Sequence, residues 1–462
     1  MPFSSGGEAD VFTRLQLKNF KGWEDTGSIR LAPITVFFGS NSSGKTSLLQ
    51  SILLLKQTAE SLDRTRVLHP GDDRTLVDLG TIEDILYGHA TDRVLQVLIR
   101  WRVPNTIMLA NRQPGDELQF RAQLGVADEG QPFVIQMAYS VVGAKVLAAM
   151  IAREDAAGYD LAALPKLTRR KGRAWPLPPP IRFYGFPDEV TNYFRNADWL
   201  ADLALELERQ LDRVHYVGPL REYPQRSYLW AGERPANVGP RGRLAVPALL
   251  AARQDKRQIG RGEGKGRRYE AFEPLIARWL KQMGIIDDFK VHQIAKGRKE
   301  YEVRVKRSPG SAEVLITDVG FGVSQVLPVL VQSYYAAEHS TVIFEQPEIH
   351  LHPKVQADLA DVFIDAARYG KVQFIVESHS EHFLRRLQRR VAEAELVTNE
   401  DVALYSCDVE AGHSIIQELK VDEYGNIANW PKDFFGDEIG DLAAMTLAGL
   451  KRQGARETDR RG

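Results

Sequence analysis

The clearest indication of the fold is the stretch ITVFFGSNSSGKTSLLQSILLL, Ile34–Leu55. Ile34–Phe38 form a continuous apolar run that is typical of a buried β-strand, and Thr46–Leu55 repeat apolar residues at helical spacing. Between them lies GSNSSGKT, Gly39–Thr46, which fits the pattern G-x-x-x-x-G-K-[ST] without a gap. The order of strand, glycine-containing loop and helix predicts a phosphate-binding loop in an α/β protein.

Each residue type in this loop suits a nucleotide phosphate. Glycine lets the backbone amides fold inward, a lysine reaches the β- and γ-phosphates, and a hydroxyl can coordinate Mg²⁺. The N-terminus of the following helix adds positive potential. We therefore expect ATP and Mg²⁺ as cofactors, bound by Gly39, Ser40, Asn41, Ser42, Ser43, Gly44, Lys45, Thr46 and Ser47.

The composition restricts the partners that the whole molecule can attract. In 462 residues, 60 lysines and arginines nearly balance 61 aspartates and glutamates, so no bulk positive field draws the molecule onto nucleic acid. Cys407 is the only cysteine, which excludes an internal disulfide and a multi-cysteine zinc site and is consistent with a reducing compartment. We expect a cytoplasmic protein, because MPFSSGGEADVF at the N-terminus lacks the pattern of a signal peptide.

The segment nearest to a membrane span is Val134–Ala152. Gln136 and Lys145 interrupt it, and the sequence VGAK at its middle is typical of a hairpin turn. The segment is therefore predicted to be a β-hairpin, and no contact with a membrane is expected.

Outward from the loop, strand and helix patterns alternate. Thr13, Leu15 and Leu17 alternate with polar neighbours, as in a half-exposed strand. Further strands are predicted at Val94–Val103, Leu118–Leu124, Phe289–Ile294, Glu300–Val305, Val372–Val376, Val402–Cys407 and Ser414–Val421. Helices are predicted at Thr191–Leu211, Tyr269–Met283 and Lys354–Ala367, and the glycine-rich basic stretch Arg253–Arg268 is predicted to be a mobile loop.

Three motifs in the second half of the chain could carry chemistry. VIFEQPEIHLHP, Val342–Pro353, is a buried strand that delivers an acid to the edge of its sheet. DVGFGVSQVLPVL, Asp318–Leu330, is a glycine-containing turn that opens a helix, and as an ordinary helix cap it would need no function. FIVESHSEHF, Phe374–Phe383, places His379 just past another buried strand, where a histidine is often only structural.

In this order, LKNFKGW, GSNSSGKTS, VGFGVSQ, FEQPEIHLHP and ESHSEHF resemble the motifs of ABC/SMC-type ATPases of the AAA family. That group includes RecF-like and OLD-like proteins and the stand-alone ATPases of bacterial anti-phage operons. YVGPLREYP, Tyr216–Pro224, and DEYGNIANWPKDFF, Asp422–Phe435, resemble one branch that carries a small C-terminal domain of unknown function.

The resemblance implies an α/β fold, an ABC/SMC-type P-loop ATPase head with a mixed sheet, an inserted α+β or helical region and a small C-terminal addition. The expected domains are an N-terminal ATPase lobe at 1–91, an insertion or arm at 92–268, a C-terminal ATPase lobe at 269–400 and the small domain at 401–462.

The resemblance also implies roles for individual residues. Lys45 and Thr46 would bind phosphate and Mg²⁺, Glu345 would support Mg²⁺, and His379 would sense the γ-phosphate. Heads of this family enclose two ATP molecules between two subunits, so we expect a homodimer or a higher homo-oligomer. The residues that would cap the partner's nucleotide are Gly320, Gly322, Ser324 and Gln325.

The residue after Glu345 is Gln346, where such ATPases usually hold the carboxylate that activates water. Glutamine can orient water but cannot accept its proton, so hydrolysis is expected to be slow or to use another base. Glu348 is the nearest candidate for that base, and the alternative is that Glu348 only caps the next helix. A metal site formed by His350 and His352 with these acids is a further alternative, although HLHP lies where such ATPases keep a loop at the dimer interface.

Two basic runs leave contact with DNA open. Arg253–Arg268 and RRLQRR, Arg385–Arg390, could touch phosphates, or they could be solvated surface. No Asp-x-Asp cluster or Cys/His nuclease motif follows His379, so cleavage would come from another protein. The expected function is an ATP-driven sensor or switch that controls an effector, a nuclease or toxin, in antiviral defence or DNA maintenance. The alternatives are a repair or recombination ATPase that binds DNA itself and a scaffold that holds ATP without hydrolysing it.

Overall fold

The computed structural model describes residues 11–103, 117–143, 146–154, 158–170, 176–262, 266–431, 434 and 445–448. Parts of several predicted features lie outside the described residues. These parts are the first ten residues of the N-terminal lobe, Lys145 of the hairpin turn, residues 263–265 of the basic stretch, and Phe435 with most of the C-terminal domain beyond it.

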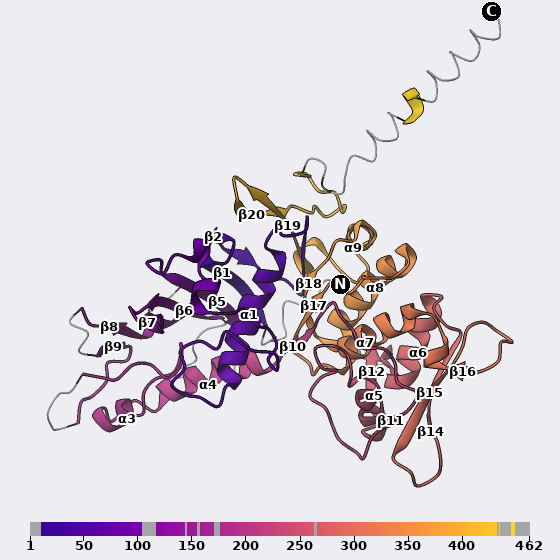
Figure 1. Cartoon of the computed structure of the whole chain (residues 1–462), viewed down its shortest axis with the longest axis horizontal. Helices are drawn as coiled ribbons and strands as arrows, with labels where there is room; N and C mark the ends of the chain where they lie inside the picture. The colour runs from indigo at the N-terminus through magenta and orange to yellow at the C-terminus, as the bar shows by residue number, and fades with distance from the viewer. Residues whose placement is uncertain are drawn as a thin grey trace, which may run out of the picture.

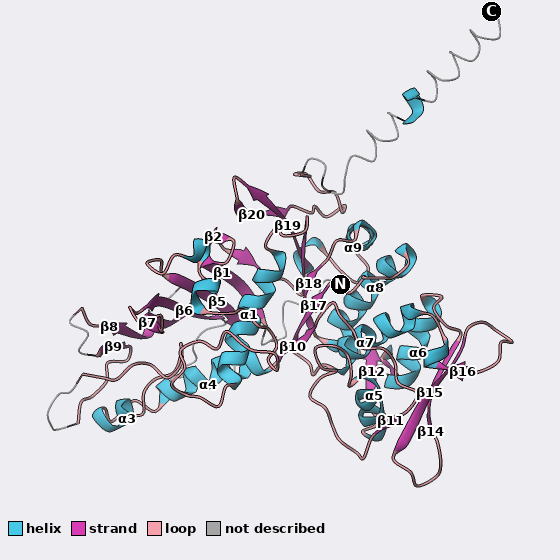
Figure 2. Cartoon of the chain, viewed as in Figure 1, coloured by secondary structure: helices cyan, strands magenta, loops and turns pink. Residues whose placement is uncertain are grey.

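A mixed six-stranded sheet forms the centre of the molecule (Figures 1 and 2). The order of its strands is β10 (Val214–Val217), β17 (Thr341–Glu345), β18 (Gln373–Glu377), β4 (Ile34–Gly39), β19 (Val402–Glu410) and β20 (His413–Leu419). All neighbours from β10 to β19 are parallel, and β20 returns antiparallel to β19. The carboxyl ends of β17, β18 and β4 therefore meet at one edge of the sheet.

The strands of this sheet separate two hydrophobic cores, because alternate residues point to opposite faces. Val36 and Phe38 belong to one core, and Phe37 between them belongs to the other. The first core is covered by α5 (Ala245–Gln254), α6 (Phe272–Gln282), α7 (Phe321–Tyr335), α8 (Pro353–Gly370) and α9 (Glu381–Glu393). The second core is covered by α1 (Lys45–Glu60), α4 (Trp199–Asp212) and a second sheet. Helices α1 and α7 thus pack on opposite faces of the central sheet.

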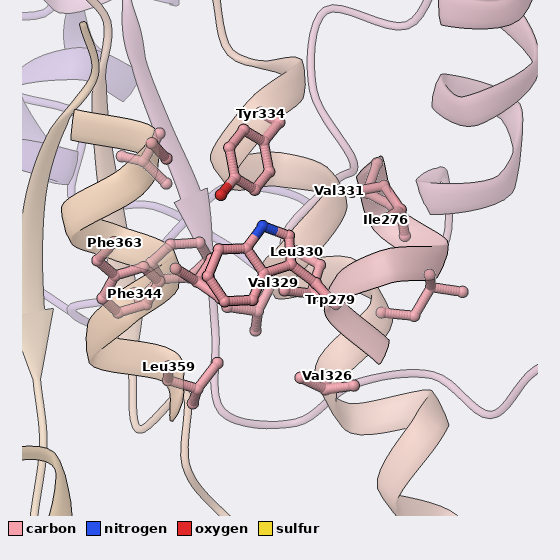
Figure 3. Packing of buried hydrophobic residues seen from close by; sticks show 14 of the residues in the cluster. Ile276, Trp279, Val326, Val329, Leu330, Val331, Tyr334, Phe344, Leu359 and Phe363 are labelled. Atoms are coloured by element: carbon pink, nitrogen blue, oxygen red, sulfur yellow. The ribbon is translucent and has the colours of Figure 1, made fainter. Parts of the chain in front are cut away.

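Aromatic side chains fill the core between α8 and the sheet. The rings of Phe344 and Phe363 stack with centroids 5.2 Å apart, and Phe363 stacks on Phe374 at 4.8 Å. Figure 3 shows Trp279 of α6 and Tyr334 of α7 closing the same core. Full burial of one such side chain stabilises a fold by roughly 1.5–3 kcal/mol, so this packing fixes α7 and α8 against the strands that carry the motifs.

The second sheet is antiparallel and has eight strands, and it lies on the left in Figure 1. It runs β2 (Trp23–Asp25), β1 (Phe12–Phe20), β5 (Leu95–Arg102), β6 (Glu117–Val126), β7 (Pro132–Val141), β8 (Val146–Ala152) and β9 (Tyr159–Ala163), with β3 (Ile29–Arg30) paired to β1. The antiparallel pairing of β7 with β8 confirms the predicted hairpin. Within the described parts of the chain, no helix has the length and apolar character needed to cross a bilayer.

The single helix predicted at Thr191–Leu211 is wrong, because α3 (Glu189–Tyr193) ends before α4 begins at Trp199. Phe194 takes an extended conformation and forms an antiparallel bridge with Arg169. The side-chain carbonyl of Asn196 also accepts a hydrogen bond from the backbone of Thr168 at 2.7 Å. These contacts with a distant segment outweigh the local helical pattern. Other short helices in the described part of the chain include α2 (Ile82–Ile85), η1 (Tyr87–His89), η3 (Ile316–Asp318) and η4 (Asn399–Asp401).

A third sheet of four strands lies beside α6, in the order β11 (Tyr228–Leu229), β15 (Glu300–Lys306) and β14 (Asp288–Gln293), with β16 (Val314–Leu315) paired to β15. Within the basic stretch predicted as a mobile loop, Arg253 and Gln254 end α5, and the strand β12 (Gln258–Arg261) pairs antiparallel with β13 (Arg268–Ala271). Its neighbour α6 consequently begins at Phe272 and not at Tyr269.

Three arginines of that stretch contact other parts of the chain. Arg253 forms a salt bridge with Glu273, and Arg257 donates to the carbonyls of Tyr335 and Ala336, each at 2.6 Å. Arg261 pairs with the buried Asp365 at 2.6 Å. These three basic residues of the predicted polyanion-binding stretch therefore already have partners within the chain.

The predicted domain limits cut through sheets. The limit at 91/92 separates β1 from its partner β5, and the limit at 400/401 separates β4 from its partner β19. The limit at 268/269 falls within β13. The division into four domains remains a prediction. Each of the two large sheets contains strands from both sides of a predicted limit.

Candidate nucleotide-binding site

The phosphate loop lies between the carboxyl end of β4 and the start of α1. Gly39 and Gly44 have φ values of 141° and 91°, in a region that favours glycine. A Cβ atom at Gly39 would lie 1.9 Å from the carbonyl oxygen of Cys407 on β19. The loop thus needs glycine both for its turns and for its close approach to the neighbouring strand.

Lys45 lies over this loop. Its Nζ donates to the carbonyls of Gly39 at 3.1 Å and Ser40 at 2.5 Å and to the hydroxyl of Ser43 at 3.3 Å. Burial lowers the pKa of the amine, and the charge of Glu377 opposes that shift. A buried ammonium group whose hydrogen bonds go to backbone carbonyls and one hydroxyl can exchange them for phosphate oxygens, so the loop fits the phosphates of ATP.

Two segments outside the motif brace the loop. The indole of Trp23 donates to the carbonyl of Gly44 at 3.2 Å and to the hydroxyl of Ser47 at 2.9 Å. Ser414 on β20 donates its backbone N–H to Gly22 at 3.0 Å, and a Cβ atom at Gly22 or at Gly44 would meet the Ser414 hydroxyl at 2.6 Å. The C-terminal hairpin β19–β20 therefore packs directly on the phosphate loop.

Glu345 ends β17 at the edge where the loop lies. It accepts a hydrogen bond from the hydroxyl of Tyr216 at 2.8 Å. Burial raises the pKa of Glu345 to about 7; the hydrogen bond from Tyr216 opposes this shift and the charge of Glu377 adds to it. The carboxyl group therefore lies in an environment where a nearby cation would favour its ionised form.

Glu377 ends β18 and is a site residue that the sequence reasoning missed. The sheet register places it directly beside Glu345 on one side and beside Phe37 on the other. It accepts the hydroxyl hydrogen of Thr46 at 2.8 Å, so the predicted Mg²⁺ ligand contacts Glu377. The available signal was that β18, like β17, is an apolar run that ends in glutamate.

Gln346 also belongs to this group. Its backbone N–H donates to the carbonyl of Glu377 at 2.9 Å, and its side-chain amide donates to the carboxylate of Glu377 at 3.5 Å. Its φ of 43° lies in the left-handed region, which few residues other than glycine adopt. The turn after β17 thus holds the glutamine against the end of β18.

Glu348 connects the turn after β17 with the turn after β18. One of its oxygens accepts the backbone N–H of His379 at 2.6 Å and the hydroxyl of Ser378 at 2.9 Å. Its other oxygen has no hydrogen-bond partner among the described residues, and burial raises its pKa. The alternative in which Glu348 only caps the next helix is wrong, because α8 begins at Pro353 and is capped by the side chain of His352.

Arg221 was also missed by the sequence reasoning. The side chain is buried, and its guanidinium donates to the carbonyls of Glu345, Gln346 and Pro347 at 3.4–3.5 Å. It lies in YVGPLREYP, a motif that indicates a family resemblance but no role for the arginine. Arg221 therefore supports the backbone that presents Glu345 and Gln346.

His379 lies at the margin of the phosphate loop. Burial and the charge of Lys45 lower its pKa, while a hydrogen bond with the backbone of Gly39 opposes that shift. The structure thus brings His379 next to the loop, together with Glu345, Gln346 and Glu348.

The predicted cap for the partner's nucleotide lies elsewhere. Gly320 precedes α7 and is exposed, whereas Ser324 and Gln325 are 5% and 2% exposed. Because α7 packs on the face of the sheet opposite α1, the structure does not bring these residues to the phosphate loop of the same chain. Across the described residues, no three histidine, cysteine or acidic side chains are grouped as metal ligands, so the structure gives no support to a site built on His350 and His352.

The phosphate loop, the parallel strands that end beside it and the two acids at their ends define a P-loop ATPase with a mixed α/β fold, as predicted. Residues 12–120 and 268–384 match the family model of an AAA ATPase domain, and residues 397–445 match a protein family of unknown function, DUF3696. The chain thus contains an AAA ATPase domain, split by the residues between the two matches, and a DUF3696 segment.

Three solved structures are similar at 12% identity over 89% of this chain. They are an Smc head bound to the C-terminal winged-helix domain of ScpA (98% of that chain, TM-score 0.45) and an Smc head with an extended coiled coil bound to the C-terminal domain of ScpA from Pyrococcus furiosus (96%, 0.45). The third is the SMC head domain from Thermotoga maritima (100%, 0.40). No curated protein matches the sequence significantly.

Proposed function

We propose that this AAA-type ATPase closes as a homodimer around two ATP molecules, hydrolyses them slowly and acts as a switch for a partner effector. The observation that carries the proposal is the placement of α1 and α7 on opposite faces of the central sheet. Because α7 leads directly into β17, its N-terminus lies toward the edge of the sheet that bears the phosphate loop, but on the other face. A second copy would supply Gly320 and the amides after it to the nucleotide of the first.

Slow hydrolysis follows from Gln346. Its amide group donates to Glu377 and cannot take a proton from water, although it can position one. Positioning and charge stabilisation carry most of phosphoryl transfer, so a glutamine at this point does not abolish it. Lys45 and the loop amides would hold the phosphates, and His379 would report the γ-phosphate to the turn that Glu348 holds. Bound Mg²⁺ would neutralise phosphate charge beside Thr46 and Glu345.

The role in antiviral defence rests on the resemblance of the motif series to the ATPases of anti-phage operons. The effector would be a separate protein, a nuclease or toxin. The rival in which the chain itself holds DNA through Arg253–Arg268 is weakened, because Arg253, Arg257 and Arg261 make internal contacts.

Light scattering tests the dimer. With a non-hydrolysable ATP analogue and Mg²⁺, the parent protein should double in mass, or a pre-existing oligomer should contract in small-angle scattering. Lys45→Ala, which removes the phosphate contact, should not respond. Identical behaviour of the two proteins would refute nucleotide-driven closure, and an ATP turnover too slow to measure in the closed dimer would favour the scaffold.

A further inference from the structure

The hydroxyl of the phosphate-loop threonine has an unexpected partner. The resemblance assigns the Mg²⁺ side of the site to Thr46 and Glu345, yet Thr46 donates to Glu377 at 2.8 Å. Glu345 instead accepts its hydrogen bond from Tyr216 at 2.8 Å. The two acids are nearest neighbours in the register of β17 and β18, and Glu377 is only 2% exposed. Two carboxyl groups therefore lie side by side at the strand ends next to the loop.

Among the residues that the structure describes, neither Glu345 nor Glu377 forms a salt bridge with a lysine or arginine. The charges of Lys45 and Glu377 interact, but the three hydrogen bonds of Lys45 go to the loop itself. Arg221 is engaged with the carbonyls of residues 345–347. Adjacent buried carboxylates repel each other unless a cation or a proton joins them. A hydroxyl and two carboxylates are also the hard oxygen donors that Mg²⁺ prefers, so the residues present fit that ion.

The other acid of the site is committed elsewhere. Glu348 accepts hydrogen bonds from the N–H of His379 and the hydroxyl of Ser378, and no hydrogen bond found among the described residues links it to Thr46. Glu348 therefore acts on the turn after β18, whereas Glu377 acts on the loop.

We propose that Glu377 is a second carboxylate of the Mg²⁺ site, so that Thr46, Glu345 and Glu377 together face the cation of the bound nucleotide. This proposal rests on the ATPase function. Under this proposal Glu377 at the end of β18 contacts the cation, a role that the motif pattern assigns only to Glu345 at the end of β17. It also accounts for Gln346, since a third carboxylate at that position would add negative charge beside Glu377, whereas an amide donates to it.

Metal affinity, measured separately from turnover, tests the assignment. Titration of Mn²⁺ into the protein–ADP complex, followed by electron paramagnetic resonance, reports the cation directly. Glu377→Gln keeps the size of the side chain and an acceptor for Thr46, and it should weaken Mn²⁺ binding at least tenfold. ADP affinity in EDTA should change less than threefold, because the phosphate contacts of Lys45 remain. Glu377→Asp should recover part of the Mn²⁺ affinity.

Glu338→Gln is the matched control, since Glu338 is exposed and pairs with Lys371 far from the loop. It should behave like the parent in both titrations. Parental Mn²⁺ affinity in Glu377→Gln would overturn the proposal, and so would a loss of ADP affinity in EDTA together with a lower melting temperature, because that result shows a structural role. A parent protein that binds no ADP at all would refute the ATPase function instead.

Discussion

Gln346 is the residue that we propose sets the rate of ATP hydrolysis. Its left-handed backbone and its two hydrogen bonds to Glu377 hold the amide between the ends of β17 and β18. The sequence was sufficient to find the loop, Glu345 and His379, because each follows a local strand pattern. It did not reveal Glu377 or Arg221, because their roles depend on which strand lies beside which and on a buried side chain that reaches a distant turn.

Gln346→Glu places a carboxylate where water would be activated. General-base assistance is worth on the order of 10²–10⁴-fold, so turnover at saturating Mg²⁺ and ATP should rise at least tenfold. Gln346→Ala, which removes the amide without adding a base, should not accelerate hydrolysis. Steady-state release of phosphate measures both. If Gln346→Glu turns over at or below the parental rate, the attacking water does not lie beside residue 346.

Among the elements, the hairpin β19–β20 was predicted as strands but not as a support of the nucleotide site. Short apolar runs identify strands, but they do not say which neighbour a strand takes. Here β19 pairs with β4, and β20 brings Ser414 to Gly22 and Gly44. The prediction of one unbroken helix from Thr191 was wrong for the same reason. The bridge between Phe194 and Arg169, from an earlier segment, follows the end of α3 at Tyr193.

Ser414→Val tests this support. The added methyl group would crowd Gly22 and Gly44, and overpacking of this kind costs about 1–3 kcal/mol. We expect ADP affinity to fall about tenfold, as the loop shifts, with a moderate loss of thermal stability. Ile415→Val on the same strand alters a side chain that is 43% exposed and should leave both values unchanged. Equal ADP affinity in the two variants would show that β20 does not position the loop.

At the level of the whole molecule, a basic side chain of the middle segment pairs with a buried acid of the ATPase core. Arg261 of β12 meets Asp365 of α8, and the hydroxyl of Tyr334 in α7 donates to the same carboxylate at 2.6 Å. In the stretch that was considered as a DNA contact, Arg261 therefore connects β12 to α8, and Tyr334 of α7 contacts the same acid. Composition and charge runs could not distinguish an internal ion pair from a DNA contact, because a basic side chain can serve in either.

Arg261→Met should destabilise the protein by roughly 3–5 kcal/mol, because removal of one partner leaves the buried charge of Asp365 without its cation. Lys256→Gln removes an exposed charge from the same stretch and should change stability by less than about 0.5 kcal/mol. Urea unfolding measures both. If the two variants were equally stable and both weakened binding to a DNA oligonucleotide, the stretch would be a nucleic-acid surface after all.

The pairing of β4 with β19 affects how the protein folds while it is being synthesised. Ile34 lies opposite Val402, so the strand that carries the phosphate loop emerges from the ribosome long before the strand that completes its sheet. Until then the edge of β4 can pair with other chains, and such open edges promote aggregation. Contacts so far apart in sequence also form slowly. A ribosome that stops before about residue 402 would thus release a product with an unprotected sheet edge, and nucleotide competence would be acquired only near the end of synthesis.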